Sequence, residues 1–370
     1  MKLTDRQGFS LISAFLLGNV LSGIGGSGFT EKTGYLSVWL SFGIFVLFAR
    51  IFQSIMKENP KDDFFTITRR CFGKIGNRIF LVFLAFYSFF AAFLSIVNYM
   101  DFINFSVKNG FPFGAGIVAV LLLTVFLCLK GTKTMGRYCE ITLPIVIGSV
   151  LLLLFLGIRE ITGVSLPLPS RAMQFFTQSW NIFCSPFAEI IFVWILFDSF
   201  QNKENIGKIS VRAGFLVTVL FTLIYVFNLN ILGENLLSET RFPTYFCASL
   251  VEIGVLVENG ESLITLAYSF CDILYGAVCV LVGVKAVCKL CDQTKIPLGK
   301  TKKITAFSAV IFMFLLYVSG IFPADLSVYY PVISVIFLPM TVGIPVLLFL
   351  LSKLKSKGQN QNSNSFSKKL

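Results

Sequence analysis

The chain has 370 residues, of which 55% are hydrophobic and only 14% are charged. Soluble domains carry about 25% charged residues, so this composition excludes a soluble enzyme or a nucleic-acid-binding protein despite the net charge of +12. It predicts an all-α, polytopic membrane protein without enzymatic activity.

Ten apolar segments are long enough to cross a membrane when hydropathy is averaged over about 19 residues. They are residues 9–28, 36–56, 79–104, 112–130, 140–158, 180–200, 211–232, 256–287, 304–322 and 327–352. We expect these spans to form one membrane domain over residues 1–352. Residues 353–370 are mostly Ser, Asn, Gln and Lys, which predicts a disordered basic tail that is attracted to anionic membrane lipid.

The distribution of Lys and Arg predicts the orientation of these spans. With ten spans, 26 basic residues fall on the side of the two termini and five fall on the other side. Basic residues are enriched in the cytoplasmic segments of membrane proteins. We therefore expect both termini to be cytoplasmic.

Glycines are concentrated in the second half of the first predicted span. Five occur within eleven residues: Gly18, Gly23, Gly25, Gly26 and Gly28. They suit either close helix packing or an unwound segment whose backbone N–H groups face a ligand at mid-membrane. On the second interpretation, Gly18, Asn19, Gly23, Gly25 and Gly26 are predicted to bind the ligand.

The sixth predicted span is interrupted by Pro186, which removes a helical hydrogen bond. Broken helices one and six are typical of five-plus-five inverted repeats, in which they flank a central solute site. We therefore place Ser185, Phe187 and Glu189 in the predicted ligand site. Glu189 could either cap the N–H groups freed by the proline or bind a substrate ammonium group.

The third and eighth predicted spans would supply the walls of such a site. Tyr87 and Leu94 share one helical face of span three, and Thr265 and Tyr268 share one face of span eight. Ordinary helix packing is the alternative for each of them. Asp272 lies on the face of Tyr268, where it could line the cavity or pair within the bundle.

Metal or cofactor chemistry is not expected. The sequence has no His and nine scattered Cys, of which Cys288 and Cys291 are the one close pair. A zinc site needs a second pair of ligands. Without His, any coupling to protons would have to use carboxylates.

Short segments spread along most of the chain resemble the spore germination receptor B subunits, the GerAB-like spore germination permeases of the amino acid-polyamine-organocation superfamily. The matching segments are Leu3-Thr4-Asp5-Arg6-Gln7, Leu17-Gly18, Gly131 to Pro144 with Arg137 and Glu140, Ser185-Pro186-Phe187 with Glu189, Phe242-Pro243 with Tyr245, and Ile253-Gly254 with Glu258 and Glu261. The chain departs from the family at Asn98 and Asn259, where Arg is frequent, and at Glu31 to Tyr35. These departures concern the identity of the ligand more than the fold.

The resemblance implies a leucine-transporter-like fold and a role in nutrient sensing. Family members bind a small germinant, for which an amino acid is expected here, in the inner membrane of bacterial spores. They act with a membrane-embedded A subunit and a lipoprotein C subunit. The alternative is a proton-coupled amino acid permease that uses Glu189 or Asp272, and a scaffold subunit without a ligand is a third possibility. The resemblance and the spacing also lead us to expect an ion pair between Arg137 and Glu140 at a helix end.

Overall fold

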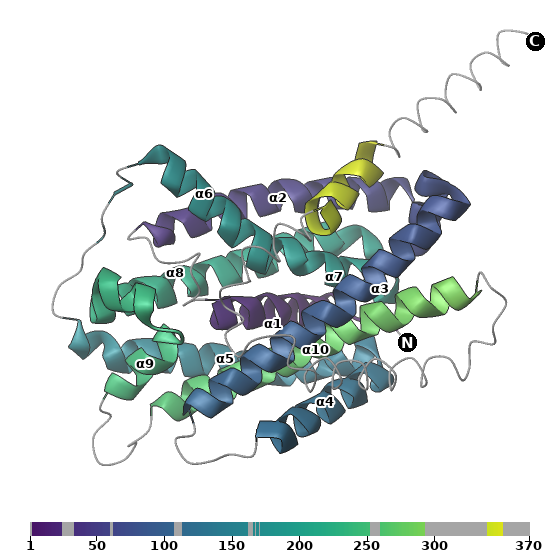
Figure 1. Ribbon diagram of the computed structural model, residues 1–370. Helices are drawn as coiled ribbons and strands as arrows, with labels where there is room; N and C mark the ends of the chain where they lie inside the picture. The colour runs from purple at the N-terminus through teal and green to yellow at the C-terminus, as the bar shows by residue number, and fades with distance from the viewer. Residues whose placement is uncertain are drawn as a thin grey trace, which may run out of the picture.

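A computed structural model of the protein consists almost entirely of helices (Figure 1). It describes residues 2–23, 33–59, 62–106, 113–161, 166, 168–169, 171–251, 260–292 and 339–350. The helices are α1 (Asp5–Gly23), α2 (Gly34–Glu58), α3 (Phe64–Ser106), α4 (Phe113–Lys130), α5 (Thr132–Gly157), α6 (Ala172–Ile182), α7 (Ile191–Ile195), α8 (Ile206–Glu239), α9 (Pro243–Leu250) and α10 (Glu261–Asp292).

Shorter turns connect some of these helices. Two are π-helical, Phe183–Phe187 and Pro339–Gly343, and four are 3-10 turns: Ile158–Glu160, Ala188–Ile190, Phe197–Ser199 and Lys203–Asn205. Within the described residues the chain forms no strand, and its single β-bridge joins Leu3 to Phe200.

The predicted spans agree with this architecture where the structure describes them. Each of the first eight overlaps one or more of the helices, and five described helices meet the length and hydropathy expected of a membrane crossing. Span nine and residues 353–370 lie outside the described residues, and span ten is described only over 339–350. The chain is therefore a multi-pass, all-α membrane protein.

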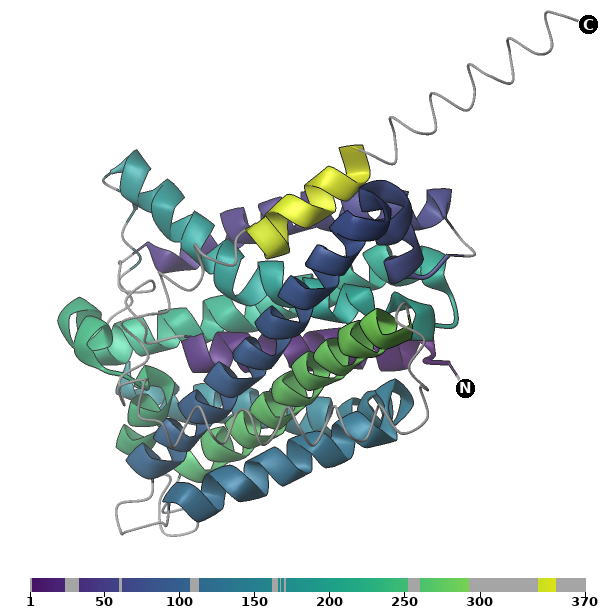
Figure 2. The same cartoon turned by 45° about the vertical axis from the view of Figure 1, so that its right-hand side comes forward.

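Helix α1 lies inside the bundle and is surrounded by other helices in both views (Figures 1 and 2). It contacts α5, α8 and α10, while α3 packs along α10 on the other side. Leu11, Phe15 and Leu21 of α1 are fully buried. A buried helix of this kind can contribute polar groups to the interior without exposing them to lipid.

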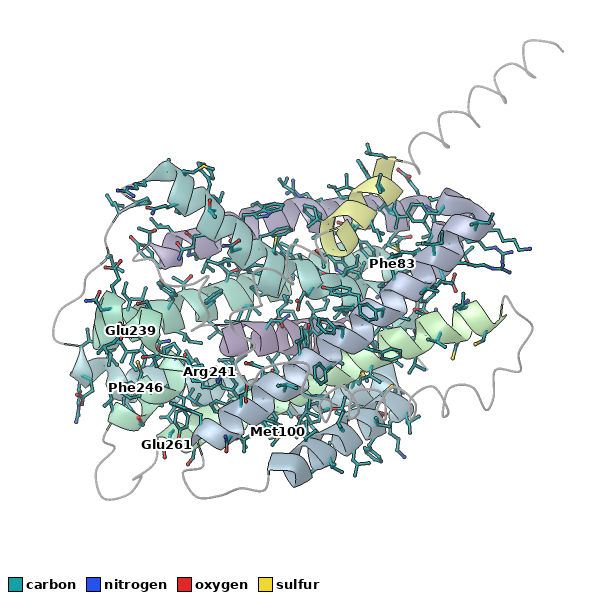
Figure 3. All side chains as sticks on the ribbon, in the orientation of Figure 1. Phe83, Met100, Glu239, Arg241, Phe246 and Glu261 are labelled. Carbon is teal, nitrogen blue, oxygen red and sulfur yellow. The ribbon has the colours of Figure 1, made fainter. Side chains whose placement is uncertain are left out.

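Large apolar side chains cover the outside of the helices. Phe83 is 60% exposed and Phe155 is 73% exposed. Figure 3 shows Phe83 on the outer side of α3, where it faces away from α10. Such an apolar surface would be unfavourable in water and is expected where helices contact lipid.

Span six is interrupted by a wide π-helical turn that is followed by a tight 3-10 turn. After α6, the chain forms the π-turn Phe183–Phe187, which contains Pro186, and then the 3-10 turn Ala188–Ile190 before α7 begins. Pro186 has no N–H to donate, so the regular hydrogen-bond pattern cannot continue through it. Glu189 lies within the 3-10 turn of this interruption.

Candidate ligand site

Helices α1 and α10 run antiparallel in close contact at the centre of the bundle. The Tyr268 hydroxyl donates a hydrogen bond to the Leu21 carbonyl, and the rings of Tyr275 and Phe15 stack with centroids 4.8 Å apart. Between these contacts a Cβ atom at Gly18 would lie 3.0 Å from the Cys271 carbonyl oxygen. Glycine at this position therefore allows the two backbones to approach.

The Glu189 carboxylate joins three of the predicted spans. Its Oε2 atom accepts hydrogen bonds from Asn19 Nδ2 of α1 at 2.8 Å and from the Tyr275 hydroxyl of α10 at 2.7 Å. Asn19 and Glu189 are 170 residues apart in sequence, and the analysis of the sequence placed both in the ligand site. The structure brings these two residues together.

Aromatic rings lie near the Glu189 carboxylate. Besides the Phe15–Tyr275 stack, the rings of Tyr87 of α3 and Phe192 of α7 approach to 4.9 Å between centroids. We call Phe15, Tyr87, Phe192 and Tyr275 the inner aromatic layer. All four side chains are almost completely buried.

A second aromatic group lies nearer the first residue of α10, at the end of the bundle that is farther from the N-terminus of the chain. We call Phe102, Phe105, Phe242, Tyr245 and Tyr268 the aromatic cap. Its shortest contact is the stack of Phe102 on Tyr268, whose centroids are 4.2 Å apart, and each of the other rings contacts at least one member. These rings fill the space between α3, α9 and α10.

An ion pair accompanies the aromatic cap. Arg241 Nη2 lies 2.8 Å from Asp101 Oδ2, and the Arg241 guanidinium lies over the ring of Phe242. Figure 3 shows Arg241 near the end of the bundle away from the N-terminus, which we call the opposite end.

Asp272 lies between the two aromatic groups. It lies four residues after Tyr268 and three before Tyr275, which places it about 6 Å and about 4.5 Å from them along the helix axis. The side chain is 4% exposed. Within the described part of the chain, its Oδ2 atom has no hydrogen-bond partner.

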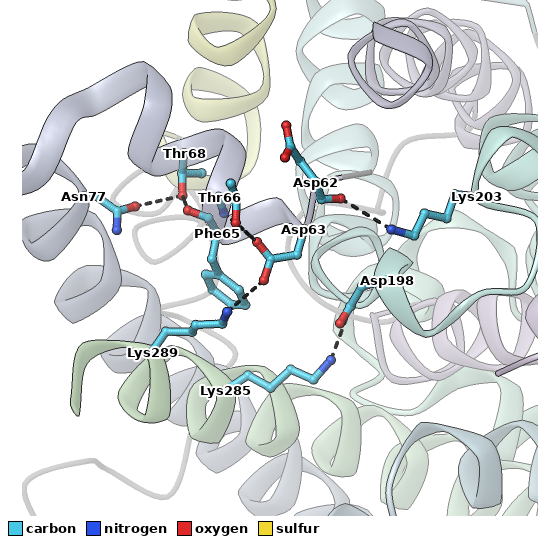
Figure 4. Close-up of polar contacts among 10 residues, drawn as sticks. All are labelled: Asp62, Asp63, Phe65, Thr66, Thr68, Asn77, Asp198, Lys203, Lys285 and Lys289. Carbon is cyan, nitrogen blue, oxygen red and sulfur yellow. Dashed lines mark hydrogen bonds and ion pairs between the residues drawn. The ribbon is translucent and has the colours of Figure 1, made fainter. Parts of the chain in front are cut away.

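Lysine–aspartate contacts connect helices at the N-terminal end of the bundle, where α10 ends (Figure 4). Lys289 Nζ lies 2.8 Å from Asp63 Oδ2, and Lys285 Nζ lies 3.4 Å from Asp198 Oδ1. Burial alone would raise the pKa of Asp63, but hydrogen bonds from Lys289 and Thr66 outweigh it, so this pKa lies below its usual range. These contacts tie α10 to the α2–α3 connection and to the end of span six.

Backbone hydrogen bonds also hold the start of the chain against the end of span six. The Leu3 N–H donates to the Ser199 carbonyl, and the Gln201 N–H donates to the Leu3 carbonyl, both at 2.8 Å. The Leu3 side chain is fully buried. The beginning of α1 and the end of span six are therefore fixed to each other.

The expected ion pair between Arg137 and Glu140 is replaced by contacts to α1. Glu140 Oε2 accepts a hydrogen bond from Gln7 Nε2 at 3.1 Å, and its Oε1 atom lies 3.7 Å from Arg6 Nε. The expectation was wrong because spacing within one helix carries no information about a side chain on another helix.

The remaining predicted site residues lie in several environments. Gly18 and Tyr268 are at the α1–α10 contact, Tyr87 is in the inner aromatic layer, and Leu94 is buried in α3. Phe187 packs against Phe45 of α2.

The structure describes the other predicted residues less completely. The Thr265 hydroxyl donates to the Glu261 carbonyl within its own helix. Gly23 ends the described part of α1, while Gly25, Gly26 and the Ser185 side chain lie outside the described residues. Tyr275 was not predicted as a site residue, although its position on the face of Tyr268 and Asp272 could have indicated it.

The polar groups brought together around α1, span six and α10 are carboxylates, amides and phenols. The described residues include no group of three or more His, Cys, Asp or Glu side chains that could hold a metal ion. A few polar groups in an apolar surrounding are typical of sites that bind small solutes.

Comparison with known proteins identifies the family. The spore germination protein family matches residues 2–321. The chain belongs to this family. No curated protein matches the sequence.

The fold of this spore germination protein is also found among solved structures. One similar structure is Mhp1, a nucleobase-cation-symport-1 family transporter in a closed conformation with bromovinylhydantoin bound. The match has a TM-score of 0.66 and 12% sequence identity, and it covers 92% of this chain and 76% of Mhp1. It shows a leucine-transporter-like fold.

Proposed function

We propose that this protein is the germinant-sensing subunit of a spore germination receptor. It binds a small solute, an amino acid, in the middle of the membrane between spans one, three, six and eight. The observation that carries the proposal is the set of hydrogen-bonded polar side chains that α1, span six and α10 bring together beside the inner aromatic layer, in a chain of the spore germination protein family.

In this proposal the protein lies in the inner membrane of a bacterial spore with both termini in the cytoplasm. The N-terminal end of the bundle then faces the spore core, and the aromatic cap lies toward the outer side. Solute binding shifts spans one and six, and the shift passes to a membrane-embedded A subunit and a lipoprotein C subunit. A solute can bias this equilibrium only through different affinities for the two conformations.

The position of Glu189 supports a role in holding spans one and six together. Its carboxylate is the common acceptor for Asn19 and Tyr275, so its partners are on both helices that line the site. Glu189→Gln keeps an oxygen that can accept both hydrogen bonds. Glu189→Ala removes the common acceptor of both hydrogen bonds, which costs about 1–3 kcal/mol for each.

The test combines reconstitution with germination assays. The purified protein should be stabilised against heat by at least one common L-amino acid, while proteoliposomes that contain it alone should not concentrate that amino acid. Spores without the gene should lose the response to the same amino acid. Glu189→Gln should restore most of the response and Glu189→Ala should restore little of it.

The competing function is a proton-coupled amino acid permease. It is favoured by the likeness of the fold to that of a transporter. Concentrative uptake by the protein alone, driven by an imposed pH gradient, would establish the permease and reject the receptor.

A further inference from the structure

Two buried polar side chains outside the predicted site have complementary unpaired atoms. Asp272 of α10 is 4% exposed and Asn98 of α3 is 8% exposed. Within the part of the chain that the structure describes, neither Asp272 Oδ2 nor Asn98 Nδ2 has a hydrogen-bond partner. When the Asp272 carboxyl is ionised, its Oδ2 atom acts only as a hydrogen-bond acceptor. The Nδ2 atom of Asn98 acts only as a donor.

The register of α3 against α10 places these two residues at the same height in the bundle. The helices are antiparallel: a Cβ atom at Gly276 would lie 3.9 Å from Ile96 Cγ1, and the Ser269 hydroxyl bonds to the Tyr99 hydroxyl at 2.8 Å. Asp272 lies between Ser269 and Gly276 on α10. The residue of α3 at the same height along the bundle is therefore close to Asn98.

Asn98 also lies on the helical face that was predicted to line the site. Tyr87 is followed by Ala91, Leu94 and Asn98 at intervals of four, three and four residues, so the four side chains form one stripe along an α-helix. All four side chains are buried. Asn98 is thus the polar member of an otherwise mostly apolar wall.

The two carboxylates of the site differ in their bonding. Glu189 accepts hydrogen bonds from Asn19 and Tyr275, whereas Asp272 has an oxygen without any partner in the described residues. A buried carboxylate is costly unless a cation or hydrogen bonds compensate it. Asp272 is therefore the better candidate for binding a positively charged group.

We propose that Asp272 binds the ammonium group of a free amino acid and that Asn98 donates a hydrogen bond to its carboxylate. This inference rests on the proposed function and assigns its solute to the class of zwitterions. An ammonium group supplies the donors that Asp272 Oδ2 needs, and a carboxylate supplies the acceptor that Asn98 Nδ2 needs. The rings of Tyr268 and Tyr275, one turn to either side, would favour a cation between them.

Other occupants fit these groups less well. A water molecule could satisfy both atoms but would not neutralise the charge of Asp272. A metal ion prefers several oxygen ligands, and the described residues offer no cluster of acidic side chains for one. A zwitterion satisfies both atoms and the charge together.

The experiment measures thermal stabilisation of the purified protein by a panel of common L-amino acids. For the amino acid that stabilises wild type most, two analogues are added to the panel. One is the amine, which lacks the carboxylate, and the other is the carboxylic acid, which lacks the ammonium group. Asp272→Asn and Asn98→Leu should each weaken binding of the amino acid about 10- to 100-fold. The amine should stabilise wild type and Asn98→Leu but not Asp272→Asn.

Two readouts separate a binding role from a structural one. Without solute, Asp272→Asn and Asn98→Leu should unfold at the same temperature as wild type or a higher one, because the first removes a buried ionisable group and the second removes an unpaired buried amide. Glu261→Gln is the matched control on α10, and it should leave the dissociation constant unchanged. Asn98→Leu tests the other end of the solute if Asp272→Asn does not insert into the membrane.

The outcomes distinguish this inference from the proposed function. If no amino acid stabilises wild type, the proposed function fails. If an amino acid binds wild type and both variants equally, the assignment of Asp272 and Asn98 is overturned and the proposed function stands. A third outcome would also overturn the assignment: NaCl, but not choline chloride, stabilises wild type, and Asp272→Asn loses this effect while its affinity for the amino acid is kept. Asp272 would then bind a metal cation.

Discussion

The two ends of the bundle are joined by different interactions, although α3 and α10 take part in both. At the N-terminal end, Lys289 contacts Asp63, and their side chains are 41% and 26% exposed, respectively. At the opposite end, Phe102 and Tyr268 stack with at most 1% exposed. Water and salt weaken exposed ion pairs, whereas the packing of buried rings is not subject to this electrostatic screening.

This difference suggests which end separates more easily. At the N-terminal end, solvent can replace the lysine–aspartate contacts that tie α10 to its neighbours, so separating α10 there costs less than separating it at the opposite end. The opposite end can open only when aromatic rings leave a dry, packed environment. We therefore expect the opposite end to contribute most of the stability and the N-terminal end to respond most to ionic conditions.

The largest expected effect is the loss of a ring from the aromatic cap. Phe102→Ala removes the partner of Tyr268 and should lower the free energy of unfolding by about 3 kcal/mol, as for other large-to-small changes in cores. Thermal or denaturant unfolding in detergent would measure it. Phe83→Ala on the same helix is the control, since Phe83 is 60% exposed and should lose little. Equal losses in the two variants would contradict the comparison.

A smaller effect is expected for the ion pair beside the aromatic cap. Arg241→Met removes the ion pair with Asp101, whose side chain is only 11% exposed. The expected loss is about 1–3 kcal/mol, the usual range for a hydrogen bond to a charged group. Combining Arg241→Met with Asp101→Asn should recover part of it. Arg159→Met, at an exposed position, should not change stability, and a similar loss there would argue against the pair.

The smallest effect is expected at the N-terminal end. Lys289→Met should cost less than about 1 kcal/mol, since Lys289 is 41% exposed and solvent screens the pair. The difference from wild type should shrink further in high salt. A loss as large as that of Phe102→Ala would show that the two ends do not differ as proposed.

The same contact predicts the direction of a pH effect. The pKa of Asp63 is lower in the folded protein than its usual value of about 3.9. The stability it contributes is thus present above about pH 4 and is lost as the pH falls through the lower, folded value. Lys289→Met should flatten this part of the stability profile measured by thermal unfolding.

Local patterns in the sequence predicted the helices and the position of one central contact. Long apolar segments located the spans because a membrane helix needs about 20 such residues. Pro186 pointed to Glu189, and the glycines of span one pointed to Asn19, and these two side chains are hydrogen-bonded. Both predictions used features within one helix.

Contacts between helices were less predictable. Spacing suggested Arg137 as the partner of Glu140, but Gln7 and Arg6 of another helix occupy that role. Tyr275 was missed because its partner Glu189 is 86 residues away. Which faces of two helices meet depends on packing along their whole length, and a single sequence does not contain that information in a local form.

The central position of α1 has a consequence for biosynthesis. Asn19 bonds to a residue made 170 positions later, and the Leu21 carbonyl accepts from one made 247 positions later. At translation rates of about 5–20 residues per second, α1 waits roughly 10–50 s for these partners. During that time its amide side chain has no carboxylate to bind. The apolar residues of α1 must therefore keep it in the membrane unaided, so polar substitutions such as Leu11→Gln should reduce membrane insertion even where the finished protein would tolerate them.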